Sequence, residues 1–182
     1  TWLWNGGASS QNVQPVVTVT ELGAPVTPIA PPTCENGQIM RVSGTDWSCG
    51  SVPNFRAYTP TSPSLISAIT KIMFSNTVGT AFSGGVFTPS VAGKYLLTAT
   101  AYINTNTTSI VSLGIYDSTC TTPHQKVYGA SGVTGSLTVT TIVDASTSDS
   151  YAVCIQKESG TSATLSATVG TSSFSGTLVS TQ

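Results

Sequence analysis

The sequence has very few charged residues and no long apolar run. Asp, Glu, Lys and Arg make up 7% of its 182 residues and the formal net charge is -1, whereas roughly a quarter of an average soluble protein is charged. Because no basic run is present to neutralise phosphates, we expect no nucleic acid partner. No apolar run approaches the roughly 20 residues that cross a bilayer, so we expect no membrane insertion.

The chain also lacks an initiator Met and a recognisable signal peptide, and it begins at Thr1. We therefore expect it to be the C-terminal part of a longer protein. Four Cys in a chain with so little charge favour an oxidising location, extracellular or on a cell or virion surface. Buried, reduced thiols are the alternative interpretation.

Residues suited to catalysis are equally sparse. His124 is the only histidine, and beside Pro123 it is predicted to lie in a solvated loop, with no motif that pairs it with a nucleophile and an orienting acid. Asp144 and Asp149 flank one predicted turn instead of facing each other across a cleft, as a glycosidase requires. No group of residues has the spacing of a metal site. The sequence therefore predicts no enzyme, no cofactor and no metal.

What the chain does contain is Ser and Thr, which make up about a third of it, and 39% hydrophobic residues. The apolar residues alternate with polar ones, which distinguishes this composition from that of a disordered segment. Thr and Val are favoured on pleated surfaces, so the composition predicts an all-β fold.

The longest predicted strand runs from Tyr95 to Ile103 and has two different faces. The odd-numbered residues from Tyr95 to Ile103 are apolar or small and predict a core-facing side. The even-numbered residues form a side that is only partly polar; they are Leu96, Thr98, Thr100 and Tyr102. A strand of this kind suits a sheet with the core on one side and a partner subunit on the other.

The same stretch carries a family resemblance. Phe87-Thr88-Pro89, followed by Gly93 and Tyr95-Leu96-Leu97, resembles the central signature of C1q-like heads, the jelly-roll branch shared with the tumour necrosis factor family. Further similar segments occur in the family's order, namely 71–74, 76–77, 110–116, 135–144, 150–156 and the Phe-Ser-Gly-x-Leu of 174–178. The usual acidic-Gly-Asp turn is replaced here by the segment 144–149. The resemblance covers residues 54–182 and implies an antiparallel jelly-roll sandwich.

Residues 1–53 differ in character and are predicted to form a neck. Four Pro between residues 25 and 32 exclude a helix or a central strand and favour an extended segment. Trp2 and Trp4 are predicted to stack on symmetry mates or a preceding shaft, or else on the neighbouring Val residues of the same chain. Cys34 and Cys49 bracket a predicted hairpin with its turn at Ser43-Gly44, and a disulfide between them would staple it.

The spacing Cys-x-x-Gly-Gln, Gly-x-x-Trp-x-Cys in residues 34–49 resembles small hairpin modules in the shafts of bacterial and phage tail-fibre-like proteins. Such modules are spacers or necks, and bacterial fibres of this kind are typically trimeric. Zinc binding is the rival interpretation of these Cys, but no further Cys or His lies at ligand spacing.

A second disulfide follows from the implied fold. In the jelly roll, the strands 110–116 and 151–156 are expected to be neighbours in one sheet, and Cys154 lies on their outward, even-numbered face. Continuing that face past Tyr116 brings Cys120 to the same side, so we expect a Cys120–Cys154 bond. Pairing either of them with Cys34 or Cys49 would tie the neck to the head and is the less favoured alternative.

The resemblance and the mixed strand face together predict a homotrimer, with Leu96, Thr98, Thr100 and Tyr102 at the axis. Strand direction then places three polar loops at the end furthest from the neck, 104–109, 130–135 and 157–163. Their predicted ligand-binding residues are Asn104, Asn106, Thr107, Ser131, Thr134, Lys157, Glu158 and Ser159, whose donors and acceptors suit sugar hydroxyls. Ordinary solvated loops are the alternative.

The predicted function is therefore the tip of a trimeric fibre or adhesin that recognises a cell surface through a glycan or an envelope component. The alternative is a secreted C1q/TNF-like ligand that binds a protein receptor. Eukaryotic heads of that kind usually follow collagen-like Gly-x-y repeats, which this sequence lacks. Some C1q-like heads hold calcium near the trimer axis, but no multidentate acidic cluster is present here, so we assign no metal.

Overall fold

The computed structural model describes residues 33–34, 38–43, 46–60, 64–65, 67–79, 81–105, 108–168 and 171–181. The chain divides into two compact units, Thr1–Gly50 and Ser51–Gln182, and each is described by itself. The described part of the chain contains no helix with the length and hydropathy needed to cross a membrane. The predictions for Trp2 and Trp4 lie outside the described residues.

The described part of the first unit is a hairpin of β1 (Gln38–Ser43) and β2 (Asp46–Ser51). A disulfide joins Cys34 to Cys49, as the sequence predicted, and closes a loop with a sequence separation of 15 residues. The turn predicted at Ser43-Gly44 lies partly outside the described residues. A bridge of this span stabilises the hairpin mainly by restricting the unfolded chain, by about 3 kcal/mol in the chain-entropy model.

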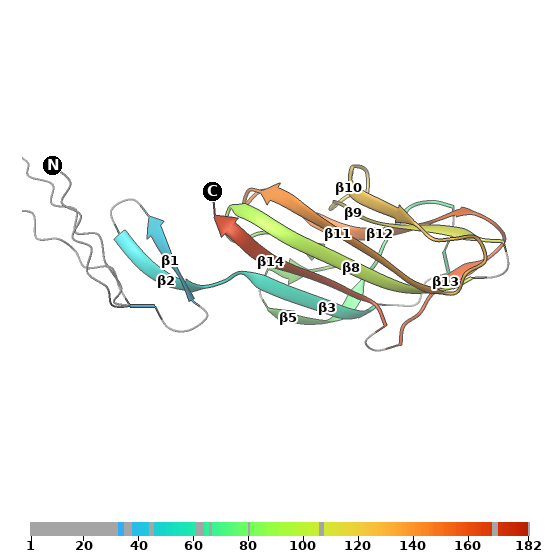
Figure 1. Ribbon diagram of the computed structural model, residues 1–182, viewed down its shortest axis with the longest axis horizontal. Helices are drawn as coiled ribbons and strands as arrows, with labels where there is room; N and C mark the ends of the chain where they lie inside the picture. Colours follow the sequence, from blue (N-terminus) through green and yellow to red (C-terminus); the bar gives the residue numbers. More distant parts are fainter. Residues whose placement is uncertain are drawn as a thin grey trace, which may run out of the picture. The chain divides into compact units, whose positions relative to one another are not determined.

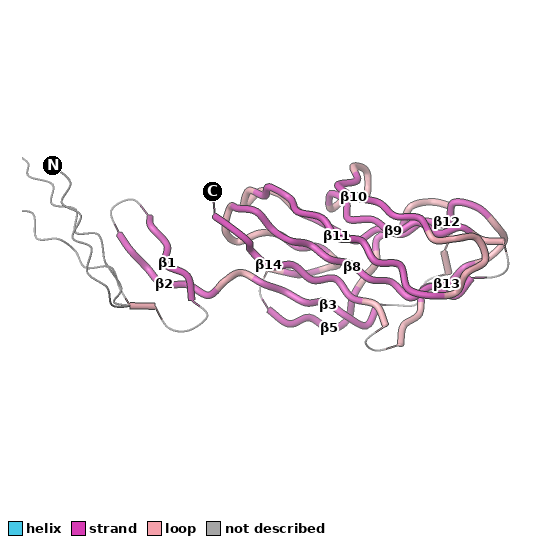
Figure 2. Tube along the Cα trace, in the orientation of Figure 1, coloured by secondary structure: helices cyan, strands magenta, loops and turns pink. Residues whose placement is uncertain are grey.

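The second unit, called the head below, is a sandwich of two antiparallel sheets (Figures 1 and 2). One sheet has the strand order β11-β8-β14-β3-β5, with β13 also paired to β8. The other has the order β10-β9-β12-β7-β6, with β4 also paired to β12. The bounds are β3 (Asn54–Pro60), β4 (Thr70–Lys71), β5 (Phe74–Gly79), β6 (Phe82–Ser83), β7 (Val86–Phe87), β8 (Gly93–Thr105), β9 (Ile110–Asp117), β10 (Pro123–Tyr128), β11 (Gly135–Ala145), β12 (Tyr151–Ser159), β13 (Ala163–Leu165) and β14 (Ser173–Thr181).

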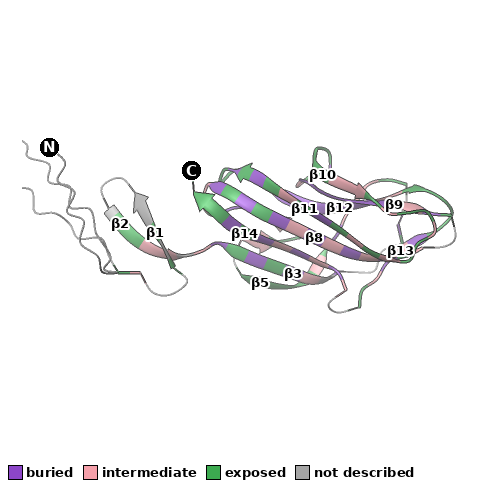
Figure 3. Ribbon diagram, in the orientation of Figure 1, coloured by how far each residue is buried: buried purple, intermediate pink, exposed green. Residues whose placement is uncertain are grey.

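The core lies between the two sheets and follows the period-2 patterns of the strands. Odd-numbered residues of β8 from Tyr95 to Ala101 are fully buried, and the alternation of burial along this strand is visible in Figure 3. One end of the core is an aromatic cluster in which the Phe55 ring stacks on Phe87 with ring centroids 4.4 Å apart and meets Phe174 edge-on at 4.9 Å. Gly176 leaves the space that the Phe55 ring occupies, since an added Cβ would collide with that ring.

Several local expectations differ from the structure. The segment 82–87 forms a hairpin of β6 and β7, whose turn residues Gly84 and Gly85 both have positive φ, as tight hairpin turns require. His124 was expected in a loop but lies in β10, where its ring contacts the Tyr151 ring at 5.0 Å.

The face of β9 that was expected to point outward is also buried. Ser112 and Tyr116 are 1% and 4% exposed, because the Ser112 hydroxyl bonds to the Glu158 carboxylate and Tyr116 packs with Cys120 of the turn after β9. Tyr116, Cys120, Ala152 and Cys154 form a second small core here, with the partly buried Ile69 packed against it. The sandwich therefore has buried side chains on both sides of its β9–β12 ladder.

Candidate functional site

The outer face of the β11-β8-β14-β3-β5 sheet, on the side away from the core, carries the residues that were predicted to form a subunit interface. Leu96 pairs with Ile142 across β8 and β11, and the next rows pair Thr98 with Thr140 and Thr100 with Thr138. The hydroxyl oxygens of these Thr pairs lie 3.2 and 3.1 Å apart, within hydrogen-bonding distance. Each hydroxyl of this ladder therefore has a partner across the strands, and the sheet surface is lined by methyl groups and paired hydroxyls.

Exposed apolar side chains extend this outer face beyond the predicted residues. Val78, Ile142 and Val179 are each more than half exposed, and Leu96 is 37% exposed. The sequence analysis missed Ile142, although the alternation of β11 places it on the same face as Thr138 and Thr140 and would have identified it. Leu96 and Ile142 are direct cross-strand neighbours, and adjacent exposed apolar side chains on a sheet indicate an interaction site.

A shallow trough of about 310 Å³ crosses the outer face. The β14 segment Ser175-Gly176-Thr177 lines it, and only the short side chains of Ser175 and Thr177 face outward there. Leu96 and Thr98 line it from β8, and Arg56 and Val78 line it from β3 and β5. The trough therefore offers an apolar depression with one guanidinium at its border.

The polar loops after β8, β10 and β12 meet at one end of the head, called the distal end below. It is opposite the end where β3 begins and β14 ends, as Figure 1 shows. The main-chain N–H of Gly132 donates to the carbonyl of Ser109 at 3.1 Å. The Ser109 hydroxyl, in turn, donates to the carbonyl of Ser162 at 2.7 Å. The loops whose convergence was predicted from strand direction are thus joined directly to one another.

The predicted ligand residues have different surroundings within these loops. Asn104, Ser131 and Ser159 are exposed. The hydroxyl of Thr134 accepts a hydrogen bond from the N–H of Thr105 at 3.2 Å, so it fastens the loop after β10 to the end of β8. Asn106 and Thr107 lie outside the described residues.

Lys157 and Glu158 make structural contacts. The Lys157 ammonium donates to the carbonyls of Gly160 and Thr161, both at 3.1 Å, and so closes its own turn. The carboxylate of Glu158, which was also predicted to bind a ligand, has partners on β9 and β10. It accepts the Ser112 hydroxyl at 2.5 Å and pairs with the Lys126 ammonium at 2.6 Å.

The electrostatics of this ion pair match its geometry. The hydrogen bond from Lys126, followed by that from Ser112, lowers the pKa of Glu158 below its usual range. Burial acts to lower the pKa of Lys126, but hydrogen bonds to Glu158 and Tyr128 outweigh it and raise this pKa. Burial also raises the pKa of the Tyr116 phenol beside the pair. Both charges are about three-quarters buried, so the pair is a fixed element of the sheet surface.

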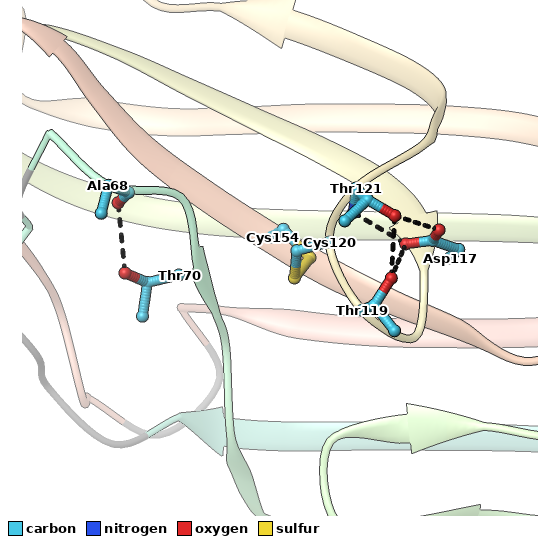
Figure 4. Close-up of a disulfide and its surroundings, with 7 residues drawn as sticks. All are labelled: Ala68, Thr70, Asp117, Thr119, Cys120, Thr121 and Cys154. Atoms are coloured by element: carbon cyan, nitrogen blue, oxygen red, sulfur yellow. Dashed lines mark hydrogen bonds between the residues drawn. A yellow bond between two sulfur atoms is a disulfide. The ribbon is translucent and has the colours of Figure 1, made fainter.

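The turn after β9 is fixed by a carboxylate and a disulfide, both drawn in Figure 4. Asp117 accepts hydrogen bonds from the Thr119 hydroxyl at 3.0 Å and from the N–H and hydroxyl of Thr121 at 2.8 and 2.6 Å. These bonds, with that of the Thr121 hydroxyl foremost, hold the pKa of Asp117 well below its usual range. Cys120 is bonded to Cys154 of β12, so the predicted second disulfide is present.

Within the described residues, no group of three or more His, Cys, Asp or Glu side chains is placed to hold a metal ion. The His124 ring lies beside the Tyr151 ring.

No protein-family model matches the chain, and no curated protein sequence matches it. Solved structures do match. The globular domain of zebrafish complement 1qA protein aligns with 72% of this chain and 100% of its own, at 13% identity and a TM-score of 0.55. Eiger TNF from S. frugiperda aligns with 72% of this chain and 94% of its own, at 10% identity and a TM-score of 0.53. PRD1 vertex protein P5 aligns with 80% and 84%, at 19% identity and a TM-score of 0.50.

These likenesses show the fold. The head is an antiparallel jelly roll of the C1q/TNF kind, as its sequence motifs predicted. The matched proteins are a complement component, a TNF and a vertex protein, and none of these names denotes an enzyme. At such low identity, function has to be argued from the surfaces of this chain.

Proposed function

We propose that the chain is the tip of a homotrimeric fibre or adhesin, outside the cell or on a cell or virion surface, and that it recognises a glycan or envelope component of a target cell. The observation that carries this proposal is the meeting of the three polar loops at the distal end. A fibre joined to the head through β3 would present this end to its target. Exposed Asn and Ser side chains there suit the hydroxyls of a sugar.

The outer face supports the trimer. Its rows of paired Thr hydroxyls can be buried without leaving a polar group unsatisfied, and its exposed apolar residues gain from burial. Few of its residues are charged, and Lys94 and Asp144 on this face already pair with each other at 2.6 Å. Three copies of a weak distal site on one fibre would bind a multivalent surface far more tightly than one copy.

A glycan array probed with the full chain tests the binding function, followed by attachment measurements on the glycans that score. The double variant Asn104→Ala and Ser131→Ala should reduce attachment, because it removes exposed donors and acceptors at the distal end. Thr147→Ala, exposed at the opposite end of the head, is the matched control. An array without any bound glycan, together with capture of one protein receptor, would favour the secreted-ligand alternative.

Light scattering tests the trimer. At micromolar concentration the expected mass is three times 18.6 kDa. Ile142→Asp should shift the protein toward a monomer, because it places a charge in the proposed interface. Val133→Asp is a matched control, since Val133 is 58% exposed and Ile142 is 60% exposed but only Ile142 lies on the outer face. A wild-type monomer, or equal effects of both variants, would refute this interface.

A further inference from the structure

The distal end contains a small cavity between the two sheets. It has a volume of about 50 Å³ and an apolar floor formed by Ile103 of β8, Val111 of β9 and Leu137 of β11. Val133, which is 58% exposed, and the exposed Ala130 lie at its lip in the loop after β10. The cavity is therefore a recess that reaches the surface among the distal loops.

The absence of a side chain at Gly135 explains the recess. Gly135 is paired with Ile103 and occupies an odd, core-facing position of β11, where Leu137 and Val139 follow with their side chains inward. A Cβ added at Gly135 would meet no described atom within 4 Å. At Gly129, on the other side of the recess, an added Cβ would meet the Leu137 side chain at 3.3 Å. Gly135 thus leaves the end of the sandwich core unfilled, whereas the Leu137 side chain already lies against Gly129.

One polar group lies in this apolar setting without a partner. Thr105 lines the cavity at the last core-facing position of β8, and its hydroxyl oxygen is buried with no hydrogen-bond partner among the described residues. A buried hydroxyl without a partner is costly and is rare in native proteins. A ligand with a polar atom next to a small apolar group would remove this cost.

We propose that the recess binds the acetamido group of an N-acetylhexosamine, an inference that rests on the proposed glycan recognition and names its sugar class. The volume corresponds to roughly three or four water-sized positions, which suits the methyl and carbonyl of an acetamido group and is far too small for a sugar ring. The methyl lies on Val111 and Leu137, and the amide carbonyl accepts the Thr105 hydroxyl. A 6-deoxy sugar would fill the floor with its methyl but would leave that hydroxyl unpaired.

The walls of the recess are held in place before any ligand arrives. The loop after β10 is fastened at Gly132 to Ser109 and at Thr134 to Thr105. A preformed site loses little conformational entropy on binding. The sugar ring would then lie across the lip, where exposed Asn104 and Ser131 are available to its hydroxyls.

Saturation-transfer NMR with the full chain tests this assignment directly. The probes are the methyl glycosides of N-acetylglucosamine and N-acetylgalactosamine, compared with those of glucose and fucose, and free N-acetyl-lysine amide. We expect the acetamido methyl to be the most strongly saturated proton group of an N-acetylhexosamine. We also expect the glucoside to bind at least about fourfold more weakly, because it lacks both this methyl and the carbonyl that accepts the Thr105 hydroxyl. Equal binding of glucoside, or stronger binding of fucoside, would overturn the assignment. N-acetyl-lysine amide binding as tightly as the sugars would overturn the sugar class.

Two variants locate the site. Gly135→Leu fills the recess and should abolish saturation of the acetamido methyl. Thr105→Val removes the hydroxyl without changing the shape; it should weaken binding by roughly 2- to 10-fold, while the unliganded head becomes no less stable. Thr161→Leu, an exposed distal position that does not line the recess, is the control. Saturation that persists in Gly135→Leu, or binding unchanged in Thr105→Val, would refute the site.

The experiments distinguish a failure of the acetamido recess from a failure of the proposed glycan recognition. Attachment only to glycans without acetamido groups would refute the recess and leave glycan recognition standing. Loss of binding to all glycans in the array would refute both.

Discussion

Removing the head disulfide should destabilise the head strongly, because the bond joins segments that are distant in sequence. Cys120 and Cys154 are separated by 34 residues. In the chain-entropy model, opening a loop of this length costs about 4 kcal/mol of unfolding free energy. At about 3–4 °C per kcal/mol for a domain of this size, the double variant Cys120→Ala and Cys154→Ala should melt about 12–16 °C below the wild type.

A matched pair of variants separates the effect of closing the loop from the effect of the left-handed backbone conformation at Cys120. Cys120 has φ of +61°, a left-handed conformation that costs an L residue about 1 kcal/mol or more. Cys120→Gly combined with Cys154→Ala should therefore recover about 1 kcal/mol relative to the Ala pair. Melting is followed by circular dichroism at one fixed subunit concentration, because trimer formation would make the midpoint depend on concentration.

A third sample controls for the packing contacts of the sulfur atoms, which the Ala substitutions also remove. Both Cys are nearly fully buried against Tyr116, so Ala also removes contacts. Wild-type protein treated with a reductant keeps the sulfur atoms and opens only the bonds, and its head should still melt at least 8 °C lower, or about two-thirds of the change estimated from loop entropy. A reduced head that melts within about 3 °C of the oxidised head would refute the loop-entropy reasoning.

Two further predictions concern charged groups. Glu158→Gln should destabilise the head by about 1 kcal/mol, since the amide oxygen still accepts the Ser112 hydroxyl. Glu158→Ala should cost about 2–3 kcal/mol, because it leaves that buried hydroxyl without a partner and Lys126 without its counter-ion; equal losses of the two variants in chemical denaturation would contradict this. The pKa of Asp117 is lowered in the folded state, so its ionised carboxylate stabilises the head. This contribution to the free energy of unfolding is complete above the unfolded carboxyl pKa of about 4 and is lost as the pH falls through the pKa of Asp117 in the folded state. Asp117→Asn should therefore melt below the wild type at pH 7 and approach it at low pH, and a constant difference from pH 7 to pH 2 would rule out this linkage.

The fold was predictable where a strand has one uniform face. The alternation in Tyr95–Ile103 identified the core side of β8, and the same period in 151–156 placed Cys154 on the face that carries the disulfide. The jelly roll itself was predicted from the order of the short motifs, through their resemblance to C1q-like heads. The strand faces are local in sequence, and their consequences follow from the pleat alone.

The details of the surfaces were not predictable in this way. Nothing near Glu158 in the sequence indicates that Ser112 and Lys126 lie beside it, since the three meet only through the β10-β9-β12 pairing. The recess escaped detection for the same reason. The sequence around Gly135 indicates only a turn. The pairing of Gly135 with Ile103 is what shows that a core position is empty.

The scarcity of charge is consistent with the proposed assembly. A sheet face that is to be buried against partner subunits must either be apolar or carry polar groups that are already paired, because desolvating a free charge costs more than a salt bridge usually returns. Thr satisfies both needs on β8 and β11, where its methyl adds apolar area and its hydroxyl pairs with the opposite Thr. On this reasoning, replacing Thr98 and Thr140 by Val should leave the trimer intact or strengthen it, whereas Thr98→Lys alone should dissociate it. Sedimentation velocity of the two variants tests this. A trimer that survives Thr98→Lys would show that the face is not buried, and dissociation by the Val pair would show that the Thr hydroxyls bond to the partner subunit instead of to each other.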